Sequence, residues 1–113
     1  MTIKVSVDFS PTPGGRYRKE GDNSGEEFRE ELLSPKFEEA IAAGEKLSID
    51  FDDTYGYPNS FIEEAFGGLA RIHGIGCVLK NIEIISYDEP GMAERVTELI
   101  RKAVDGRGKG KDA

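Results

Sequence analysis

Apolar and polar side chains alternate along two stretches of the chain, at residues 3–9 and 47–51, and a third apolar stretch lies at residues 82–87. A period of two places the apolar side chains on one face of an extended segment, so these stretches predict strands with one buried face. A short fourth strand is predicted over residues 16–19. The prolines and glycines of residues 11–15 separate it from the first strand by a turn.

Between these strands, apolar residues recur three or four positions apart, which is typical of helices with one buried face. We predict such helices over residues 24–43, 60–73 and 90–104. The first two begin at a serine, Ser24 and Ser60, with a glutamate three residues later. This spacing is that of a capping box, in which both side chains satisfy free amides of the first helical turn.

This order of elements predicts an α/β fold, with a small mixed four-stranded sheet backed by about three helices on one face. The opposite face of the sheet is then open to solvent or covered by a partner. We expect the domain to occupy residues 1–104. Residues 105–113 are rich in glycine and charged residues, which predicts a flexible C-terminal tail.

Composition and charge narrow the range of functions. The 113 residues carry a formal net charge of −7, which fits one small domain whose surface repels the phosphate backbone of nucleic acids. No apolar run approaches the ~18 residues that a membrane span needs. Cys77 is the only cysteine, so an internal disulfide is excluded and a reducing compartment is expected. We therefore expect a cytoplasmic protein that binds neither nucleic acid nor membrane.

Asp50, Asp52 and Thr54 stand at the end of a predicted strand, in a spacing that resembles the first motif of haloacid-dehalogenase-like phosphatases. This resemblance implies a magnesium-dependent phosphoryl-transfer enzyme, in which Asp50 attacks phosphate and Asp52 acts as acid and base. Strand alternation also explains both aspartates, because it places them together on the wet face of the strand. No later acidic pair follows in a Gly-Asp context, so we expect no enzymatic activity and keep phosphoryl transfer as the alternative.

His73 and Cys77 are four residues apart, a spacing that suits metal ligands on one helix. Gly74 and Gly76 interrupt the helix between them, and the chain has no other histidine or cysteine. Zinc needs three or four ligands of this kind. We therefore predict no metal site, and with a single histidine and a single cysteine we predict no catalytic triad and no catalytic residue.

The segment at residues 58–69 carries the most informative pattern. Ser60 opens a helix directly after a strand and a short loop, where a kinase can reach it and where phosphate gains from the helix dipole. The simpler explanation is that Ser60 only caps the helix. Gly67 and Gly68 each cost about 1 kcal/mol inside a helix relative to alanine, which indicates a close approach, either by a neighbouring element of the same domain or by a partner protein.

Four separated segments, at residues 14–21, 24–29, 49–52 and 60–69, together resemble the bacterial STAS-like domain family of unknown function. That family is itself similar to STAS domains such as anti-sigma-factor antagonists. The resemblance implies a mixed sheet backed by helices, a role in binding a partner protein of the histidine-kinase ATPase type, and no cofactor. It also implies a serine at a helix start that accepts phosphate from the partner, a position that falls on Ser60.

We expect the partner to bind at the start of the 60–73 helix and at the loop before it. The expected partner-binding residues are Tyr55, Tyr57, Asn59, Phe61, Glu64, Gly67, Gly68, Arg16, Arg18 and Arg29. The three arginines have a second explanation, because they equally well neutralise the acidic helix faces. A third function is also open, in which an open sheet face or strand edge pairs with a copy of itself to form a homodimer.

Overall fold

The computed structural model describes residues 1–112, with side chains described up to Lys102. The predicted tail at residues 105–113 falls where no side chain is described, and Ala113 lies outside the described residues altogether. The flexibility of this segment therefore stays a prediction.

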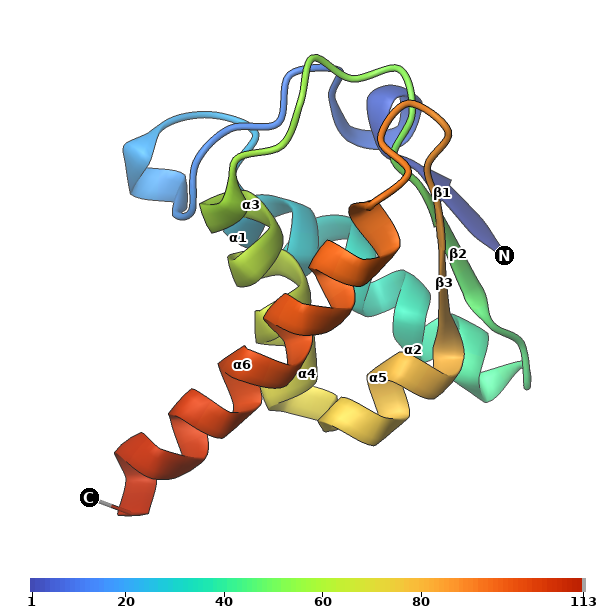
Figure 1. The fold of residues 1–113 in the computed structure, drawn as a ribbon. Coiled ribbons are helices and arrows are strands. Elements are labelled where there is room, and N and C mark those ends of the chain that lie inside the picture. The colour runs from blue at the N-terminus through green and yellow to red at the C-terminus, as the bar shows by residue number, and fades with distance from the viewer. Residues whose placement is uncertain (113) are drawn as a thin grey trace.

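The centre of the fold is a sheet of three strands, β1 (Thr2–Lys4), β2 (Leu47–Asp50) and β3 (Ile82–Ile85). They lie in the order β1-β2-β3, and both neighbouring pairs are parallel (Figure 1). The predicted α/β class is confirmed. The predicted sheet is wrong in two respects, because within the described residues it has three strands rather than four and is parallel rather than mixed.

The missing fourth strand was expected at residues 16–19. Here the chain forms a short 3-10 helix, η2 (Arg18–Glu20). The Glu20 carboxylate turns back to accept hydrogen bonds from the amides of Arg16 and Tyr17, each at 3.0 Å. The Tyr17 amide and then the Arg16 amide hold the pKa of Glu20 below its usual value. These local bonds occupy the amides that a neighbouring strand would need.

The first strand is also shorter than expected. It ends at Lys4, and residues 5–9 form a π-helical turn, η1 (Val5–Phe9). The Asp8 carboxylate accepts the amide of Lys4 at 2.8 Å, and the Ser10 amide donates to the Val5 carbonyl oxygen at 2.8 Å. This turn leaves Val7 exposed, although the alternation places it on the buried face.

Two long helical segments contain a π-helical stretch in the middle. The first consists of α1 (Gly25–Phe28), η3 (Arg29–Leu33) and α2 (Ser34–Ala42). The second consists of α3 (Asn59–Ile62), η4 (Glu63–Gly67) and α4 (Gly68–His73). The predicted helices over residues 24–43 and 60–73 are confirmed.

Two further helices follow, α5 (Ile75–Asn81) and α6 (Met92–Asp112). The sequence pattern missed α5, because Gly74 and Gly76 were expected to end the helical region. Gly74 does turn the chain, with a positive φ of 96°, but the chain resumes a helix at the next residue. Among the described residues, none of the helices combines the length and the apolar character that crossing a bilayer requires.

All helices lie on one side of the sheet (Figure 1). Apolar side chains of the strands, such as Ile3 and Ile49, are buried there together with Phe28, Phe61 and Phe66. The register places the other strand residues on the opposite face, and none of these is buried: Thr2, Lys4, Ser48, Asp50, Glu83 and Ile85. The expectation of helices on one face with a polar second face is confirmed for the described residues.

The first and second helical segments approach each other closely at Gly25. A Cβ atom at this position would collide with the main-chain carbonyl of Phe61. Gly25 is buried, and the ring of Phe28 packs against the ring of Phe61 at 5.6 Å between centroids. This contact fixes the start of α3 against the core, and therefore fixes the position of Ser60 and of the loop before it.

Candidate functional site

The candidate site lies where the three parallel strands end. Strand β1 leads into residues 5–15, β2 into residues 51–58 and β3 into residues 86–91, and these segments meet at the top of the molecule in Figure 1. We call these three segments the carboxyl edge. In open α/β sheets, ligands and partners commonly bind at this edge, because loops of variable sequence gather there on a rigid support.

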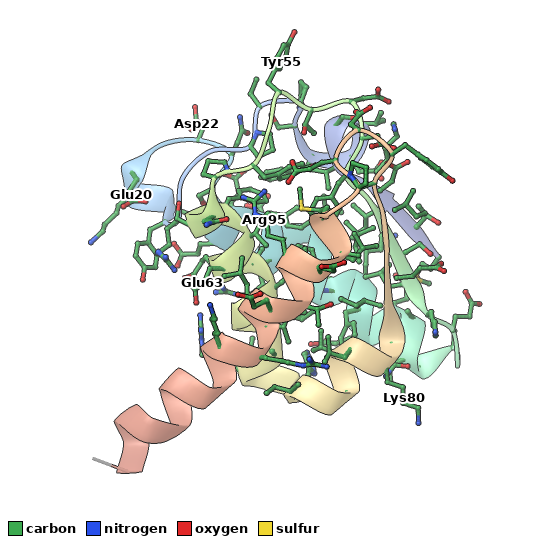
Figure 2. The ribbon with its side chains drawn as sticks, in the orientation of Figure 1. Glu20, Asp22, Tyr55, Glu63, Lys80 and Arg95 are labelled. Atoms are coloured by element: carbon green, nitrogen blue, oxygen red, sulfur yellow. The ribbon has the colours of Figure 1, made fainter. Side chains whose placement is uncertain are left out.

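Tyr55 stands at the tip of the loop before α3. It is 89% exposed, and its ring points away from the body of the molecule (Figure 2). Its amide donates to the carbonyl oxygen of Pro11 at 2.9 Å, so the loop is held to the segment after β1. Gly56 follows with a φ of 126°, a left-handed conformation that favours glycine.

Tyr57 lies in the same loop but points inward. Its hydroxyl donates to the carbonyl oxygen of Phe51 at 3.0 Å, and its ring packs 4.8 Å from Phe51 and 5.8 Å from Phe61. Burial raises the pKa of Tyr57 to about 12. The side chains of Tyr57 and Phe61, both expected at a partner surface, therefore help to fix the loop from within the core.

Arg95, on α6, closes the other side of the loop. Its guanidinium donates to the Tyr57 carbonyl oxygen at 2.6 Å, to Asn59 Oδ1 at 2.7 Å and to Glu89 Oε2 at 3.0 Å. Figure 2 shows it between α6 and α3. Sequence reasoning missed Arg95, because nothing in the local pattern of α6 distinguishes it from a solvated arginine.

Ser60 is the second residue of α3, and the N-cap is Pro58. The expected capping box with Glu63 is wrong, because the Pro58 backbone supplies the helix start and the Glu63 carboxylate binds arginines instead. No described hydrogen bond involves the Ser60 hydroxyl. Ser60 itself is half-buried.

Three arginines surround two glutamates on the next turn of this helix. Arg16 pairs with Glu63, and its Nη1 lies 3.7 Å from Glu64 Oε1. Arg29 Nη1 donates to Glu64 Oε2 at 2.6 Å, and Arg71 Nη1 lies 3.2 Å from Glu63 Oε2. The structure thus brings together Arg16, Arg29 and Glu64, but their charges satisfy one another within the domain.

Arg18 lies apart from this cluster. Its guanidinium binds Glu30 at 3.1 Å and Glu31 at 3.0 Å, on the outer side of η3. The Glu31 carboxylate contributes most to raising the pKa of Arg18 above its usual value. Here too the contacts of the arginine neutralise an acidic helix face.

Gly67 and Gly68 are both buried. A Cβ atom at Gly68 would collide with the guanidinium of Arg29, which crosses the helix at this point. Of the two explanations that the sequence left open, the close approach at Gly68 comes from a neighbouring element of the same domain. Among the expected partner-binding residues, four are buried and contribute to the packing under the site: Phe61, Glu64, Gly67 and Gly68. Tyr55 and Asn59 are exposed on the surface of the site.

The aspartates at the carboxyl end of β2 and directly after it hold the loops of the carboxyl edge together. The Asp52 carboxylate accepts the amides of Asp88 and Tyr87 at 2.8 and 2.9 Å. The Asp88 amide contributes most to lowering the pKa of Asp52. Asp50 Oδ1 accepts the Asp52 amide at 2.9 Å, and its other oxygen lies 3.4 Å from Lys4 Nζ.

Residues of metal-ligating type are not clustered in the described part of the chain. It contains no group of three or more histidine, cysteine, aspartate or glutamate side chains that could hold a metal ion. The imidazole of His73 packs against Phe37, with 5.0 Å between ring centroids, and the thiol of Cys77 is half-buried on α5.

A parallel sheet with helices on one face, and a loop presented at the carboxyl edge, define a small α/β domain (Figure 1). A family model described as STAS-like domain of unknown function (DUF4325) matches residues 24–92, which is more than half of the chain. The chain belongs to this STAS-like family. No curated protein and no solved structure gives a significant match.

Proposed function

We propose that this STAS-like domain is a non-enzymatic regulatory module that binds a partner protein through residues 54–60. The partner is an ATPase of the histidine-kinase type, and phosphate on Ser60 changes its affinity. The role resembles that of an anti-sigma-factor antagonist.

The observation that carries this proposal is the presentation of Tyr55. A large aromatic side chain is 89% exposed at the tip of a loop that is fixed on both sides. The Tyr55 amide binds Pro11, the Tyr57 hydroxyl binds Phe51, and Arg95 binds the Tyr57 carbonyl oxygen. Exposed tyrosines that need little reordering are frequent centres of protein interfaces, because they bury a large area at a small entropic cost.

The surroundings of Ser60 support a regulatory role for the same surface. Among the described residues its hydroxyl has no hydrogen-bond partner, and it lies in the first turn of a helical segment that extends to His73. Phosphate there adds about −1.5 to −2 charges near free first-turn amides. Coupling between such sites is typically ~1–3 kcal/mol, which changes an affinity about fivefold to 150-fold.

The test is the affinity of the purified chain for the histidine-kinase-type ATPase of the same genome, measured by isothermal titration calorimetry. We expect Tyr55→Ala to weaken binding by about thirtyfold, as truncation of an interface aromatic typically does. We expect Ser60→Asp to change the affinity and Ser60→Ala to leave it near that of the wild type. Ile41→Ala is the control, because Ile41 is also exposed but lies at the end of α2. Equal binding by all four variants would contradict the proposal.

A further inference from the structure

The three most exposed large apolar side chains of the described residues lie on the carboxyl edge. Tyr55 is 89% exposed, Tyr87 is 84% exposed and Val7 is 73% exposed. Each follows a different strand, so three separate segments of the chain independently present an apolar side chain to solvent. Exposed apolar groups gathered in one region of a small domain commonly mark an interaction surface.

The same edge carries only negative charge. Its three segments contain five carboxylates and no lysine, arginine or histidine: Asp8, Asp52, Asp53, Asp88 and Glu89. The two cations at its border are already engaged, since Lys4 binds Asp53 at 2.9 Å and Arg95 binds Glu89 at 3.0 Å. Within the described part of the chain, no cationic side chain pairs with Asp8, Asp52 or Asp88.

Hydrogen bonds join the three segments to one another. The Asp52 carboxylate holds the amides of Tyr87 and Asp88, and the Asp53 amide donates to Asp88 Oδ2 at 2.9 Å. The Tyr55 amide holds the segment after β1 through Pro11. The backbone segments that carry these side chains are therefore held together before a partner binds, so binding costs little conformational entropy of the loops.

We propose that the carboxyl edge binds a positively charged segment of a partner protein, one in which arginine or lysine alternates with apolar residues. Cationic groups of such a segment would pair with the carboxylates or lie over the faces of Tyr55 and Tyr87, while its apolar groups cover Val7. The inference rests on the proposed function and deepens it, because Tyr55 belongs to both surfaces. A second copy of this chain fits poorly, since it would oppose carboxylates with carboxylates.

Tyr17 provides a matched contrast on another part of the surface. It is 39% exposed, but the guanidinium of Arg16 and the ammonium of Lys19 already lie 5.9 and 5.8 Å from its ring centroid. A cationic partner therefore has no reason to choose Tyr17, whereas Tyr55 and Tyr87 have acidic neighbours.

The experiment follows the amide resonances of the 15N-labelled full chain during titration with a short peptide of alternating leucine and arginine. A matched peptide of alternating leucine and glutamate is the control ligand. We expect shifts confined to residues 7–8, 52–56 and 87–89 with the arginine peptide only, and a several-fold weaker affinity at high salt. Shifts spread over all acidic helix faces, shifts with both peptides, concentration-dependent shifts without peptide, or no shifts at all would overturn the inference.

Variants of the chain separate the contribution of the exposed tyrosines to peptide binding from that of the carboxylates. We expect Tyr55→Ala with Tyr87→Ala to weaken the arginine peptide about tenfold, and Tyr17→Ala to leave it unchanged. We expect Asp8→Asn with Asp88→Asn to weaken it several-fold, because the asparagine side-chain oxygens can still accept the hydrogen bonds that the Lys4 and Asp53 amides donate, but asparagine carries no charge. Equal binding by either double variant and the wild type would contradict the assignment.

The two proposals fail in distinguishable ways. If the arginine peptide binds the edge but the histidine-kinase-type ATPase does not bind the chain, the proposed function fails and the basic partner segment stands. If the ATPase binds through Tyr55 and the Asp8→Asn, Asp88→Asn variant binds it equally well, the proposed function stands and the charge preference is wrong.

Discussion

Arg29 Nη1 donates to Glu64 twice, to the carboxylate at 2.6 Å and to the main-chain carbonyl oxygen at 2.7 Å. The two residues belong to the two π-helical stretches, η3 and η4. A π-helical turn displaces the hydrogen-bonding pattern by one residue, and such turns often occur where a helix must present a particular group. Here the Arg29 side chain, from one stretch, donates a hydrogen bond to a main-chain oxygen of the other stretch.

Removal of the Glu64 carboxylate leaves the Arg29 guanidinium without its main partner. Both side chains are largely buried, 13% and 9% exposed. We expect Glu64→Leu to lower the free energy of unfolding by about 2–4 kcal/mol, because an uncompensated charge remains near the core. Urea unfolding measures this. Glu98→Leu is the control, since Glu98 forms an exposed pair with Lys102, and we expect a change within about 0.5 kcal/mol. Equal effects of both variants would contradict the structural importance of the Arg29 pair.

Gly68 leaves room for the Arg29 guanidinium, so the effect of adding a methyl group at Gly68 depends on whether Arg29 is present. Alanine is normally about 1 kcal/mol more favourable than glycine inside a helix. We expect Gly68→Ala to destabilise the protein in the wild-type background, where the added methyl group displaces the guanidinium, and to stabilise it in an Arg29→Ala background. Thermal unfolding of the four proteins in this double-mutant cycle measures the coupling.

A matched control exists at Gly76 on α5. A Cβ atom there meets no atom within 4 Å beyond its chain neighbours and the backbone of its own helix, so we expect Gly76→Ala to be neutral or stabilising in both backgrounds. Additive effects of Gly68→Ala and Arg29→Ala would show that the two residues do not share the space described above.

Tyr57 makes stability depend on alkaline pH. Its pKa is about 12 in the folded chain because of burial, against an ordinary value of 10.0. The hydroxyl stays protonated in the folded state while it ionises in the unfolded state, so its contribution is complete below pH 10 and is lost as pH rises towards 12. We expect Tyr57→Phe to reduce the loss of stability over this range, as measured by chemical unfolding at each pH. An identical pH dependence of stability in the wild type and in Tyr57→Phe would contradict the claim that burial raises the pKa of the Tyr57 hydroxyl.

Arg95 fixes the loop from the side of α6. We expect Arg95→Leu to speed amide hydrogen exchange at residues 55–60, because it removes hydrogen bonds to the Tyr57 carbonyl oxygen and to Asn59. Arg101→Leu is the control, since Arg101 is exposed and lies further along the same helix. Unchanged exchange in Arg95→Leu would mean that the loop is held without this residue.

A magnesium titration tests the alternative function, in which Asp50 and Asp52 belong to a phosphoryl-transfer enzyme. The carboxylates of Asp50 and Asp52 already accept backbone amides, and Lys4 lies beside Asp50. We expect millimolar magnesium to leave the amide resonances of both aspartates unchanged. Saturable shifts at these two residues would instead favour the phosphoryl-transfer enzyme that their spacing resembles.

The sequence predicted the elements whose burial pattern is regular. Strand β2 and the helical segments at residues 25–42 and 59–73 follow directly from their periodic apolar residues. The pattern failed where one polar side chain redirects the backbone. The Asp8 carboxylate accepts the Lys4 amide and stabilises the π-helical turn after β1. The Glu20 carboxylate accepts the Arg16 amide and stabilises η2 where the fourth strand was expected. Such bonds depend on side-chain geometry that the order of apolar and polar residues does not contain.

For the candidate site, the sequence located the loop and the helix start but not their internal contacts. Tyr55 and Asn59 are exposed as expected, whereas Phe61 and Glu64 are buried. The period of a helix shows which residues share a face, but not how much of the helix surface the neighbouring elements cover. Arg95 could not be found at all, because it reaches the loop from 38 positions along the chain from Tyr57.

The central claim is that residues 54–60 are the surface that a partner covers. Hydrogen–deuterium exchange of the chain, free and in complex with the histidine-kinase-type ATPase, tests it most directly. The account predicts slower exchange at residues 54–60 on binding, with α2 unchanged. Slower exchange confined to α2 or to the polar face of the sheet, with residues 54–60 unaffected, would contradict it.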